Sequence, residues 1–341
     1  MNMSILNKLV AGIDLTGGEA REAMDSIMDG LCTESQIAAF LTALKMKGET
    51  IEEVSAFAQS IRHKADKIDY RHDHLVDCCG TGGDYSNTFN ISTTAAFIAA
   101  GAGVKVAKHG NRSITSKSGG ADVLEKLGVV LSPDKNTIIE CLDMANIGFL
   151  FAPRHHESFK YAVPVRKQLG FRTVFNLLGP LVNPALVEKQ VMGVYDGKLV
   201  HICANVLNDL GVKRAMVIHG KDGIDEITLT GKSIVSEVNS GKVYDYEINP
   251  CDYGFELCSD DDLTGSTPKV NAEILASILD GVKGPKRDIA VLNAAASIYI
   301  SGIASTYQEG LKKAEESIDK GLAKARLNIM REVTRGKRHA G

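Results

Sequence analysis

Several features that mark particular classes of protein are missing from this chain. Its seven cysteines form no Cys-x-x-Cys pair and no Cys/His zinc spacing, which argues against a zinc site and predicts a reducing compartment. No stretch approaches the roughly 18 apolar residues of a membrane-spanning helix, and no basic segment followed by an apolar run opens the chain. The sequence therefore supports neither secretion nor membrane spanning, and we expect a cytoplasmic protein.

An excess of positive charge is also missing. Lys and Arg together number 39 and Asp and Glu 42, which gives a formal net charge of −3. This balance gives no general electrostatic attraction to nucleic acid, so we expect no nucleic-acid partner and favour a small phosphorylated substrate. With 44% hydrophobic and 24% charged residues, the 341-residue chain can form one large or two modest domains.

Two familiar nucleotide-binding fingerprints are absent as well. There is no G-x-G-x-x-G, because Tyr85 occupies the position of the third glycine, and there is no G-K-[ST] of a P-loop. The stretch that comes nearest, residues 75–94, nevertheless has an instructive order. A buried strand is followed by a turn with three glycines in four positions and then by a helix that begins near Ser92.

This order of strand, glycine-rich turn and helix start predicts an anion site. Glycine accepts positive φ and lets the backbone approach a ligand, while the free N–H groups at a helix start face an anion. Neutral hydroxyl donors are abundant in the same stretch: Thr81, Ser86, Thr88, Ser92 and Thr93. The alternative is a glycine-rich strand-to-helix connection with a serine cap and no ligand.

The remaining pattern predicts a helical module followed by an α/β region. Residues 1–67 read as helices, and three of them begin with capping boxes: Thr16 with Glu19, Thr33 with Gln36, and Thr50 with Glu53. From His74 onward strands and helices alternate, which is typical of α/β proteins. We further expect a strand over residues 129–131, a helix started by Ser132-Pro133-Asp134, a two-stranded ribbon over 233–249, and one long helix over 308–335.

Four motifs, in this order, make the sequence similar to a known family. They are C-G-T-G-G-D with T-F-N-I-S-T in residues 79–93, K-H-G-N-R-S in residues 108–113, G-P-L-V-N-P in residues 179–184, and Asp225-Glu226. Together they resemble the anthranilate phosphoribosyltransferase family, and the resemblance extends to about residue 330. It implies transfer of the 5-phosphoribosyl group from PRPP to the amino group of anthranilate, in L-tryptophan biosynthesis.

The resemblance also implies a fold and an assembly. The fold would be α/β with a small all-α domain, of the nucleoside phosphorylase/phosphoribosyltransferase type, with a mostly parallel central sheet flanked by helices. Residues 1–70 would form the helical domain, joined in space by about 158–188, and residues 71–157 and 189–341 the PRPP-binding domain. The expected partners are PRPP, anthranilate, a second copy of the chain in a homodimer, and two Mg²⁺ ions per subunit.

The resemblance assigns roles to particular residues. Lys108, Asp225 and Glu226 would be catalytic, and Ser92, Asp225 and Glu226 would hold magnesium. Arg166 would contact the anthranilate carboxylate, and His109 and His156 would line the anthranilate entry. The full set expected to bind substrates is Gly80, Gly83, Asp84, Thr88, Asn90, Ile91, Ser92, Thr93, Lys108, His109, Gly110, Asn111, Arg112, Ser113, Ile114, Thr115, Ser116, Gly120 and Arg166.

Each assignment has a simpler alternative when the residue is taken alone. Lys108 could be a surface lysine, Asp225-Glu226 a solvated acidic pair, and Arg166 a cation that satisfies carbonyls at a helix C-terminus. Either histidine could be a packed side chain. The sequence also departs from the family pattern, because Tyr85 replaces a common glycine and Gly120 a common serine.

Two competing functions remain at this stage. A pyrimidine nucleoside phosphorylase shares the fold and also cleaves an N-glycosidic bond, but it would use phosphate without metal-bound pyrophosphate. A non-enzymatic or nucleic-acid-binding relative would have lost the catalytic motifs, which this chain retains. Dependence on magnesium and PRPP distinguishes the first alternative, and binding to single-stranded DNA distinguishes the second.

Overall fold

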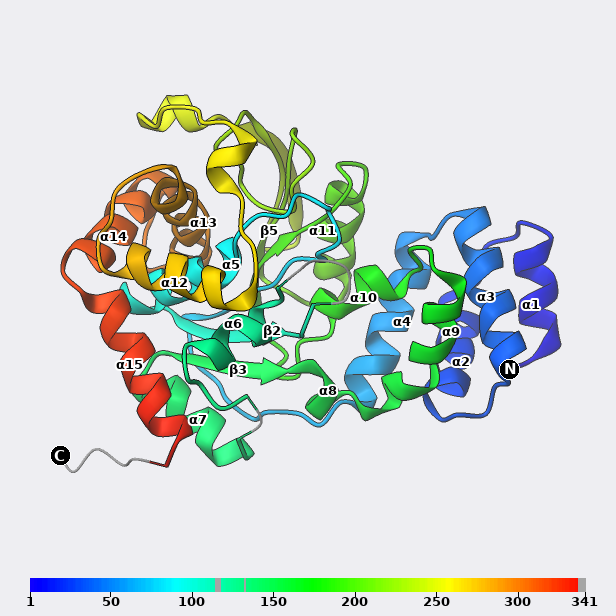
Figure 1. Cartoon of the computed structure of the whole chain (residues 1–341). Helices are drawn as coiled ribbons and strands as arrows, with labels where there is room; N and C mark the ends of the chain where they lie inside the picture. The colour runs from blue at the N-terminus through cyan, green and yellow to red at the C-terminus, as the bar shows by residue number, and fades with distance from the viewer. Residues whose placement is uncertain (114–117, 132, 337–341) are drawn as a thin grey trace.

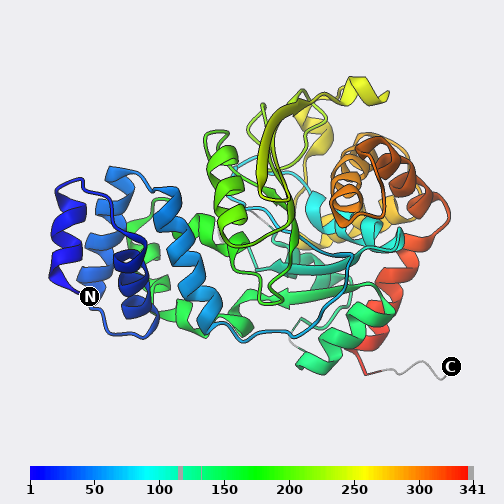
Figure 2. The same cartoon turned by 180° about the vertical axis from the view of Figure 1, so that it is seen from behind.

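A computed structural model describes residues 1–113, 118–131 and 133–336 of the chain (Figure 1). The predicted site residues Ile114, Thr115 and Ser116 and the predicted helix cap Ser132 lie outside the described residues. The chain forms a helical part and a larger α/β part, with the N-terminus in the first and the last described helix, residues 322–334, on the far side of the second (Figures 1 and 2). Within the described residues, none of the helices has the length and apolar content needed to cross a bilayer.

The helical part begins with four helices whose start points follow from their capping residues. They are α1 (Met3–Val10), α2 (Gly17–Met28), α3 (Glu34–Lys47) and α4 (Ile51–Lys64). The three predicted capping boxes are confirmed at the starts of α2, α3 and α4. In each box a threonine hydroxyl accepts a backbone N–H, and a Glu or Gln side chain accepts the threonine N–H in return.

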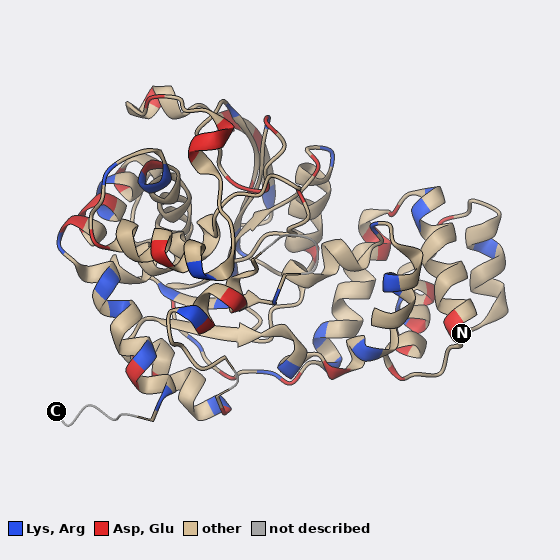
Figure 3. Cartoon of the chain, viewed as in Figure 1, with Lys and Arg blue, Asp and Glu red and all other residues tan. Residues whose placement is uncertain are grey.

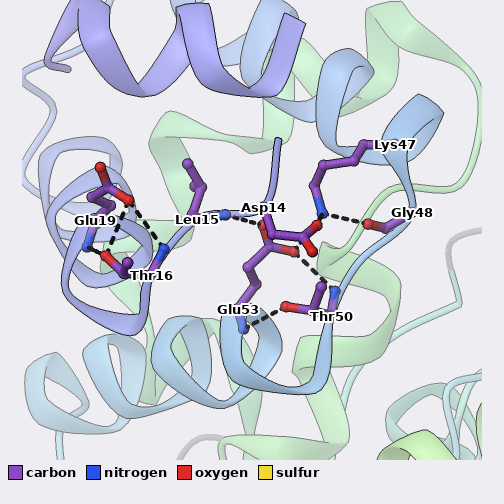
Figure 4. Close-up of polar contacts among 8 residues, drawn as sticks. All are labelled: Asp14, Leu15, Thr16, Glu19, Lys47, Gly48, Thr50 and Glu53. Atoms are coloured by element: carbon purple, nitrogen blue, oxygen red, sulfur yellow. Dashed lines mark hydrogen bonds and ion pairs between the residues drawn. The ribbon is translucent and has the colours of Figure 1, made fainter. Parts of the chain in front are cut away.

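Glu53, the acid of the third capping box, does more than cap its helix (Figure 4). Its side chain is fully buried, and it accepts hydrogen bonds from the backbone N–H groups of Thr50 and Leu15, each at 2.9 Å. Lys47 Nζ lies 2.9 Å from the same carboxylate and 2.6 Å from Asp14. The carboxylate therefore joins the start of α4, the end of α3 and the loop before α2.

The α/β part is built on a seven-stranded sheet in the order β3-β2-β1-β4-β5-β6-β7. The strands are β1 (Leu75–Cys78), β2 (Lys105–Gly110), β3 (Ile147–Phe151), β4 (Lys189–Gly193), β5 (Arg214–Gly220), β6 (Ser233–Asn239) and β7 (Lys242–Ile248). Strands β1 to β5 pair in parallel, and β6 and β7 add antiparallel, which confirms the predicted ribbon and the mostly parallel sheet.

The strand order reverses at β1, because β2 lies on one side of it and β4 on the other. In open parallel sheets ligands bind at such a switch point, outside the carboxyl ends of the strands. The glycine-rich loop, residues 79–90, leaves β1 at this end and leads into α5 (Ile91–Gly101). The topology thus places this loop where a ligand is expected.

Helices cover both faces of the sheet. Along β5, Ala215 and Val217 belong to one apolar cluster and Met216 and Ile218 to another, as the two-residue repeat of a strand requires. The first cluster contains α11 (Leu199–Asp209). The second contains residues of α5, α6 (Gly120–Lys126), α7 (Lys135–Met144), α12 (Pro268–Leu279), α13 (Pro285–Ser301), α14 (Tyr307–Asp319) and α15 (Leu322–Thr334).

The segment between β3 and β4 returns to the helical part. It contains α8 (Ala152–His155), a 3-10 helix (Glu157–Tyr161), α9 (Val163–Leu169) and α10 (Phe175–Leu181). Helix α9 packs against α3, and α10 packs against α4, as Figure 1 also shows. Two further 3-10 helices, Pro250–Tyr253 and Asp260–Leu263, lie in the connection from β7 to α12.

Two predicted elements are wrong. Residues 129–131 form no strand, because the backbone there leaves α6 in a tight turn in which Val129 N–H donates to Leu124. The single long helix over 308–335 is two helices, α14 and α15, separated at Gly321, whose φ is 71°. A left-handed glycine ends α14, and the chain turns so that Ala323 packs closely on Gly101 of α5.

Candidate functional site

The glycine-rich loop turns sharply at residues that L side chains rarely tolerate. Gly82 and Gly83 have φ of 62° and 74°, which is the left-handed region that favours glycine. Gly80 has a different constraint, because a Cβ atom there would lie 3.2 Å from Cγ of Asp225 and still closer to its carboxylate oxygen. The loop therefore needs glycine at two positions for its conformation and at a third for the approach of a carboxylate.

Asp225 and Glu226 lie in the loop that follows β5, and both bind the glycine-rich segment. Asp225 accepts a hydrogen bond from the Gly82 N–H at 2.7 Å, and Glu226 accepts one from the Ser92 N–H at 3.0 Å, at the start of α5. Burial and then the nearby Asp84 carboxylate raise the pKa of Asp225 to about 7. Burial and then Asp225 raise the pKa of Glu226 well above its usual value.

Burial, and then repulsion from neighbouring carboxylates, thus disfavour the ionised forms of Asp225 and Glu226. A cation with hard oxygen ligands would relieve this repulsion, so the donor set fits Mg²⁺. Within the described residues, no group of three or more His, Cys, Asp or Glu side chains is arranged to hold a metal ion by itself. Such an ion would therefore need oxygen atoms from a substrate or from water, which is how proteins usually bind Mg²⁺.

Lys108 is buried near the end of β2 and points toward the start of α5. Its Nζ atom donates to the Cys78 carbonyl at 2.5 Å and to the Ser92 hydroxyl at 3.2 Å. Burial alone would lower the pKa of Lys108, but the surrounding negative groups raise it, Glu226 among them. The side chain is therefore a charged ammonium group at the floor of the site, and the alternative of a surface lysine is wrong.

A cavity of about 280 Å³ lies over this loop, α5 and the end of β2. Most predicted site residues line it: Gly80, Gly83, Asp84, Thr88, Asn90, Ile91, Ser92, Thr93, Lys108, His109, Gly110, Asn111, Arg112, Ser113, Gly120, Asp225 and Glu226. The structure thus brings together segments that are more than 130 residues apart in the sequence. Nitrogen donors and carboxylates face each other across a space large enough for a sugar phosphate.

Several lining residues are missing from the predicted set. Most are neighbours of predicted ones along the chain: Cys79, Gly82, Asn87, Phe89, Ser118 and Gly119. Thr81 and Ser86, which were predicted as hydroxyl donors of the anion site, also line the cavity. Two others, Phe149 and Asn176, come from β3 and α10. Asn176 also accepts the Thr173 N–H at 3.0 Å, a local turn that the sequence T-V-F-N could have indicated.

Arg166 and His156 do not line this cavity. Arg166 lies on α9, with its guanidinium carbon 5.3 Å from the centre of the Phe175 ring. Burial lowers the pKa of Arg166, and no neighbouring carboxylate offsets that effect within the described part of the chain. A half-buried cation that stacks on an aromatic ring is well suited to bind a planar carboxylate.

A continuous row of rings joins Arg166 to the cavity. Phe175 contacts Phe159 (centroids 5.7 Å apart), Phe159 stacks on His156 (5.3 Å), and His156 contacts the cavity residue His109 (5.2 Å). Burial lowers the pKa of His156 to about 4 and that of His109 well below its usual value, so both rings are neutral near pH 7. The row therefore links the helical part to the cavity through closely packed rings, and two of its three contacts are edge-to-face.

Comparison with known proteins first defines the class of the molecule. Residues 3–65 match the helical bundle domain of a glycosyl transferase family, and residues 72–324 match the a/b domain of the same family. Together the two matches account for the helical part and the sheet. The chain therefore belongs to a glycosyl transferase family with a helical bundle domain and an a/b domain.

Individual relatives narrow the class further. The sequence is 52% identical to the anthranilate phosphoribosyltransferase of Acetivibrio thermocellus over 329 residues, which is 96% of this chain and 95% of that protein. The crystal structure of the Thermus thermophilus enzyme superposes with a TM-score of 0.92 at 38% identity and covers 97% of this chain and 99% of that one. The chain therefore belongs to the anthranilate phosphoribosyltransferase family.

A third relative has its ligands in place. The Saccharomyces cerevisiae enzyme, solved in complex with PRPP and Mg, is 29% identical, with a TM-score of 0.89 and 98% of each chain covered. These relatives agree with the predicted fold class and family. Their names and ligands do not by themselves assign roles to individual residues of this chain.

Proposed function

We propose that this protein transfers the 5-phosphoribosyl group of PRPP to the amino group of anthranilate, which gives N-(5-phosphoribosyl)anthranilate and pyrophosphate in L-tryptophan biosynthesis. One observation carries the proposal. A single cavity collects the glycine-rich loop, the buried Lys108 and the acidic pair Asp225-Glu226. A row of rings leads from it to Arg166, which has no ion pair among the described residues.

The donor side of the reaction would be the glycine-rich loop with α5. Backbone N–H groups and hydroxyls of residues 80–93 would hold pyrophosphate oxygens, with the positive end of the α5 dipole behind them. Lys108 adds a fixed positive charge and at the same time orients the Ser92 hydroxyl. As pyrophosphate leaves C1 of the ribose, these donors would stabilise the charge that develops on it.

Magnesium would be held by Asp225, Glu226 and the Ser92 hydroxyl, and we propose two ions per subunit. When bound, magnesium would neutralise the pyrophosphate leaving group. The Gly82 and Ser92 N–H groups already orient one oxygen of each acid. The second oxygen of each carboxylate would face the cation.

The acceptor side would be the ring-lined path. Arg166 would bind the anthranilate carboxylate with parallel hydrogen bonds, and the partly exposed ring of Phe159 would contact the aromatic ring of the substrate. The amino group of an aniline is already unprotonated at neutral pH, so the reaction needs no strong general base. The neutral histidines agree with this, since neither would compete with Arg166 for the carboxylate.

We also propose the two domains and the homodimer that were predicted from the sequence. The helical domain would be residues 1–70 with about 158–188, which the packing of α9 on α3 supports. A homodimer through this domain is supported by large apolar side chains on α1 and α3 that are exposed in the monomer, such as Val10 at 76% and Met46 at 84%. Sedimentation that finds only monomer at micromolar concentration would contradict the dimer.

A direct assay tests the proposed reaction. The purified protein is mixed with anthranilate, PRPP and MgCl₂, and the fluorescence of anthranilate is followed as it is consumed, with identification of the product by mass. We expect turnover that requires both PRPP and magnesium. Phosphorolysis of a pyrimidine nucleoside without PRPP would instead favour the nucleoside phosphorylase. Figure 3 shows that acidic and basic residues are interspersed along both parts of the chain.

A further inference from the structure

Arg172 lies between two tyrosines beside the glycine-rich loop, in the connection from α9 to α10. Its guanidinium carbon is 5.0 Å from the centre of the Tyr85 ring and 4.2 Å from that of Tyr195. One of its nitrogens donates a hydrogen bond to the Gly83 carbonyl. The side chain thus contacts the loop by stacking and by hydrogen bonding at neighbouring residues.

Tyr85 has an unusual backbone and an unusual exposure. Its φ is 61°, in the left-handed region that costs a non-glycine residue free energy, and its side chain is 70% exposed. Burial of the ring therefore does not explain why the loop accepts a tyrosine here. Stacking on Arg172 explains it, because a cation placed over an aromatic face stabilises the folded loop even near the surface.

The hydrogen bond to Gly83 has a geometric consequence. The carbonyl of Gly83 and the N–H of Asp84 belong to one planar trans peptide and point in opposite directions. By holding the carbonyl, Arg172 fixes the direction of that N–H, which belongs to a residue that lines the cavity. The neighbouring Gly82 and Gly83 have positive φ and would otherwise let this peptide rotate at little cost.

Tyr195, on the other side of Arg172, is itself fixed to the loop. Its N–H donates to the Thr81 hydroxyl at 3.1 Å, just after β4. Arg172 also precedes Thr173, which begins the turn that presents Asn176 to the cavity. The stack therefore ties together three chain segments, residues 81–85, 170–174 and 194–195, at one side of the cavity.

We propose that Arg172, stacked between Tyr85 and Tyr195, is a positioning residue that sets the shape of the glycine-rich loop for binding PRPP. This inference rests on the proposed function. Arg172 does not line the cavity, so it acts through the Gly83-Asp84 peptide rather than by contact with the substrate. One half of the stack depends on Tyr85, at a position where the family resemblance implies a glycine.

The test compares three single variants. Arg172→Lys keeps the charge but loses the planar stack and the forked donor, and Tyr85→Gly removes the stacking ring from an exposed position. We expect Arg172→Lys to raise the KM for PRPP about tenfold and Tyr85→Gly about threefold, with kcat and the KM for anthranilate nearly unchanged. Tyr85→Phe keeps the ring and should behave as the wild type.

The double variant gives the sharper result. If the two residues act through one stack, Arg172→Lys with Tyr85→Gly raises the KM for PRPP no more than Arg172→Lys alone. Multiplication of the two single effects would mean that they act separately and would overturn the proposal. A loss of thermal stability with unchanged affinity for PRPP would also overturn it, because the contact would then be structural only.

Calorimetric titration of the protein with PRPP in the presence of magnesium distinguishes a failure of this inference from a failure of the proposed function. Wild-type protein that does not bind PRPP would overturn both the proposed function and the positioning role. Wild-type binding with equal affinity in Arg172→Lys would overturn the positioning role alone. Weaker binding in Arg172→Lys and Tyr85→Gly, with wild-type binding in Tyr85→Phe, is the result we expect.

Discussion

Gly80→Ala tests the site with the smallest possible change, one methyl group. The φ of Gly80 is not in the left-handed region, so alanine meets no backbone strain there. The new Cβ would instead lie 3.2 Å from Cγ of Asp225 and closer to a carboxylate oxygen. To reach ordinary contact the carboxylate must retreat by about 1 Å, a misplacement that can cost on the order of 100-fold in rate.

The assay for Gly80→Ala is kcat at saturating PRPP, anthranilate and magnesium, with thermal unfolding measured alongside. We expect a loss of kcat of roughly two orders of magnitude and a small change in melting temperature, because a half-buried carboxylate can move without opening the core. Gly82→Ala is the matched control, since it has φ of 62° but no atom within 4 Å of the added Cβ. It should cost stability more than rate.

Two outcomes would refute this reasoning. If Gly80→Ala kept kcat within about twofold of the wild type, the position of Asp225 would not matter to the reaction. If Gly82→Ala lost as much rate as Gly80→Ala, the effect would come from loop conformation in general rather than from the displaced carboxylate.

Three further changes have expected outcomes. Arg166→Ala should raise the KM for anthranilate about ten- to a hundredfold and leave that for PRPP unchanged, as steady-state kinetics with each substrate varied can check. Glu53→Ala should lower the free energy of unfolding in urea by about 3–5 kcal/mol, because the N–H groups of Leu15 and Thr50 lose their acceptor. Glu53→Gln keeps an acceptor oxygen and should lower the free energy of unfolding by less. Burial depresses the pKa of His156 to about 4, so as the pH falls the unfolded chain binds a proton at this residue before the folded protein does. The free energy of unfolding should therefore decline between about pH 6.5 and 4. His156→Phe should make this decline smaller, as unfolding measured at several pH values can check.

The parts of the fold that could be predicted from the sequence are those fixed by local physics. The capping boxes at Thr16, Thr33 and Thr50 satisfy backbone groups within one helical turn, so three or four letters suffice to find them. The strand and helix that flank the glycine-rich loop are defined in the same way. The break at Gly321 was missed because the amphipathic pattern continues on both sides of it, and only the close packing on Gly101 requires the turn.

For the candidate site as well, only residues in local sequence motifs could be predicted. Residues in contiguous motifs, such as 79–93 and 108–113, could be named from the sequence, and those described line one cavity. Their roles in binding and catalysis remain predictions. Arg172 could not be found in this way, because its importance depends on Tyr85 and Tyr195, which lie 87 residues before it and 23 after it in the sequence, and no local pattern links them.

The apolar cluster that contains α11 has a consequence for motion. It extends without a break from Met24, Phe40 and Phe57 of the helical part through Phe175 to Leu207 of α11, and α4 packs directly on α11. A wide hinge opening would have to expose this interior to water at each catalytic cycle. Small sliding of α10 and α4 along α11 would keep it covered. Relative motion of the two parts is therefore expected to be a sliding of packed helices, and not the opening of a gap between two separate bodies.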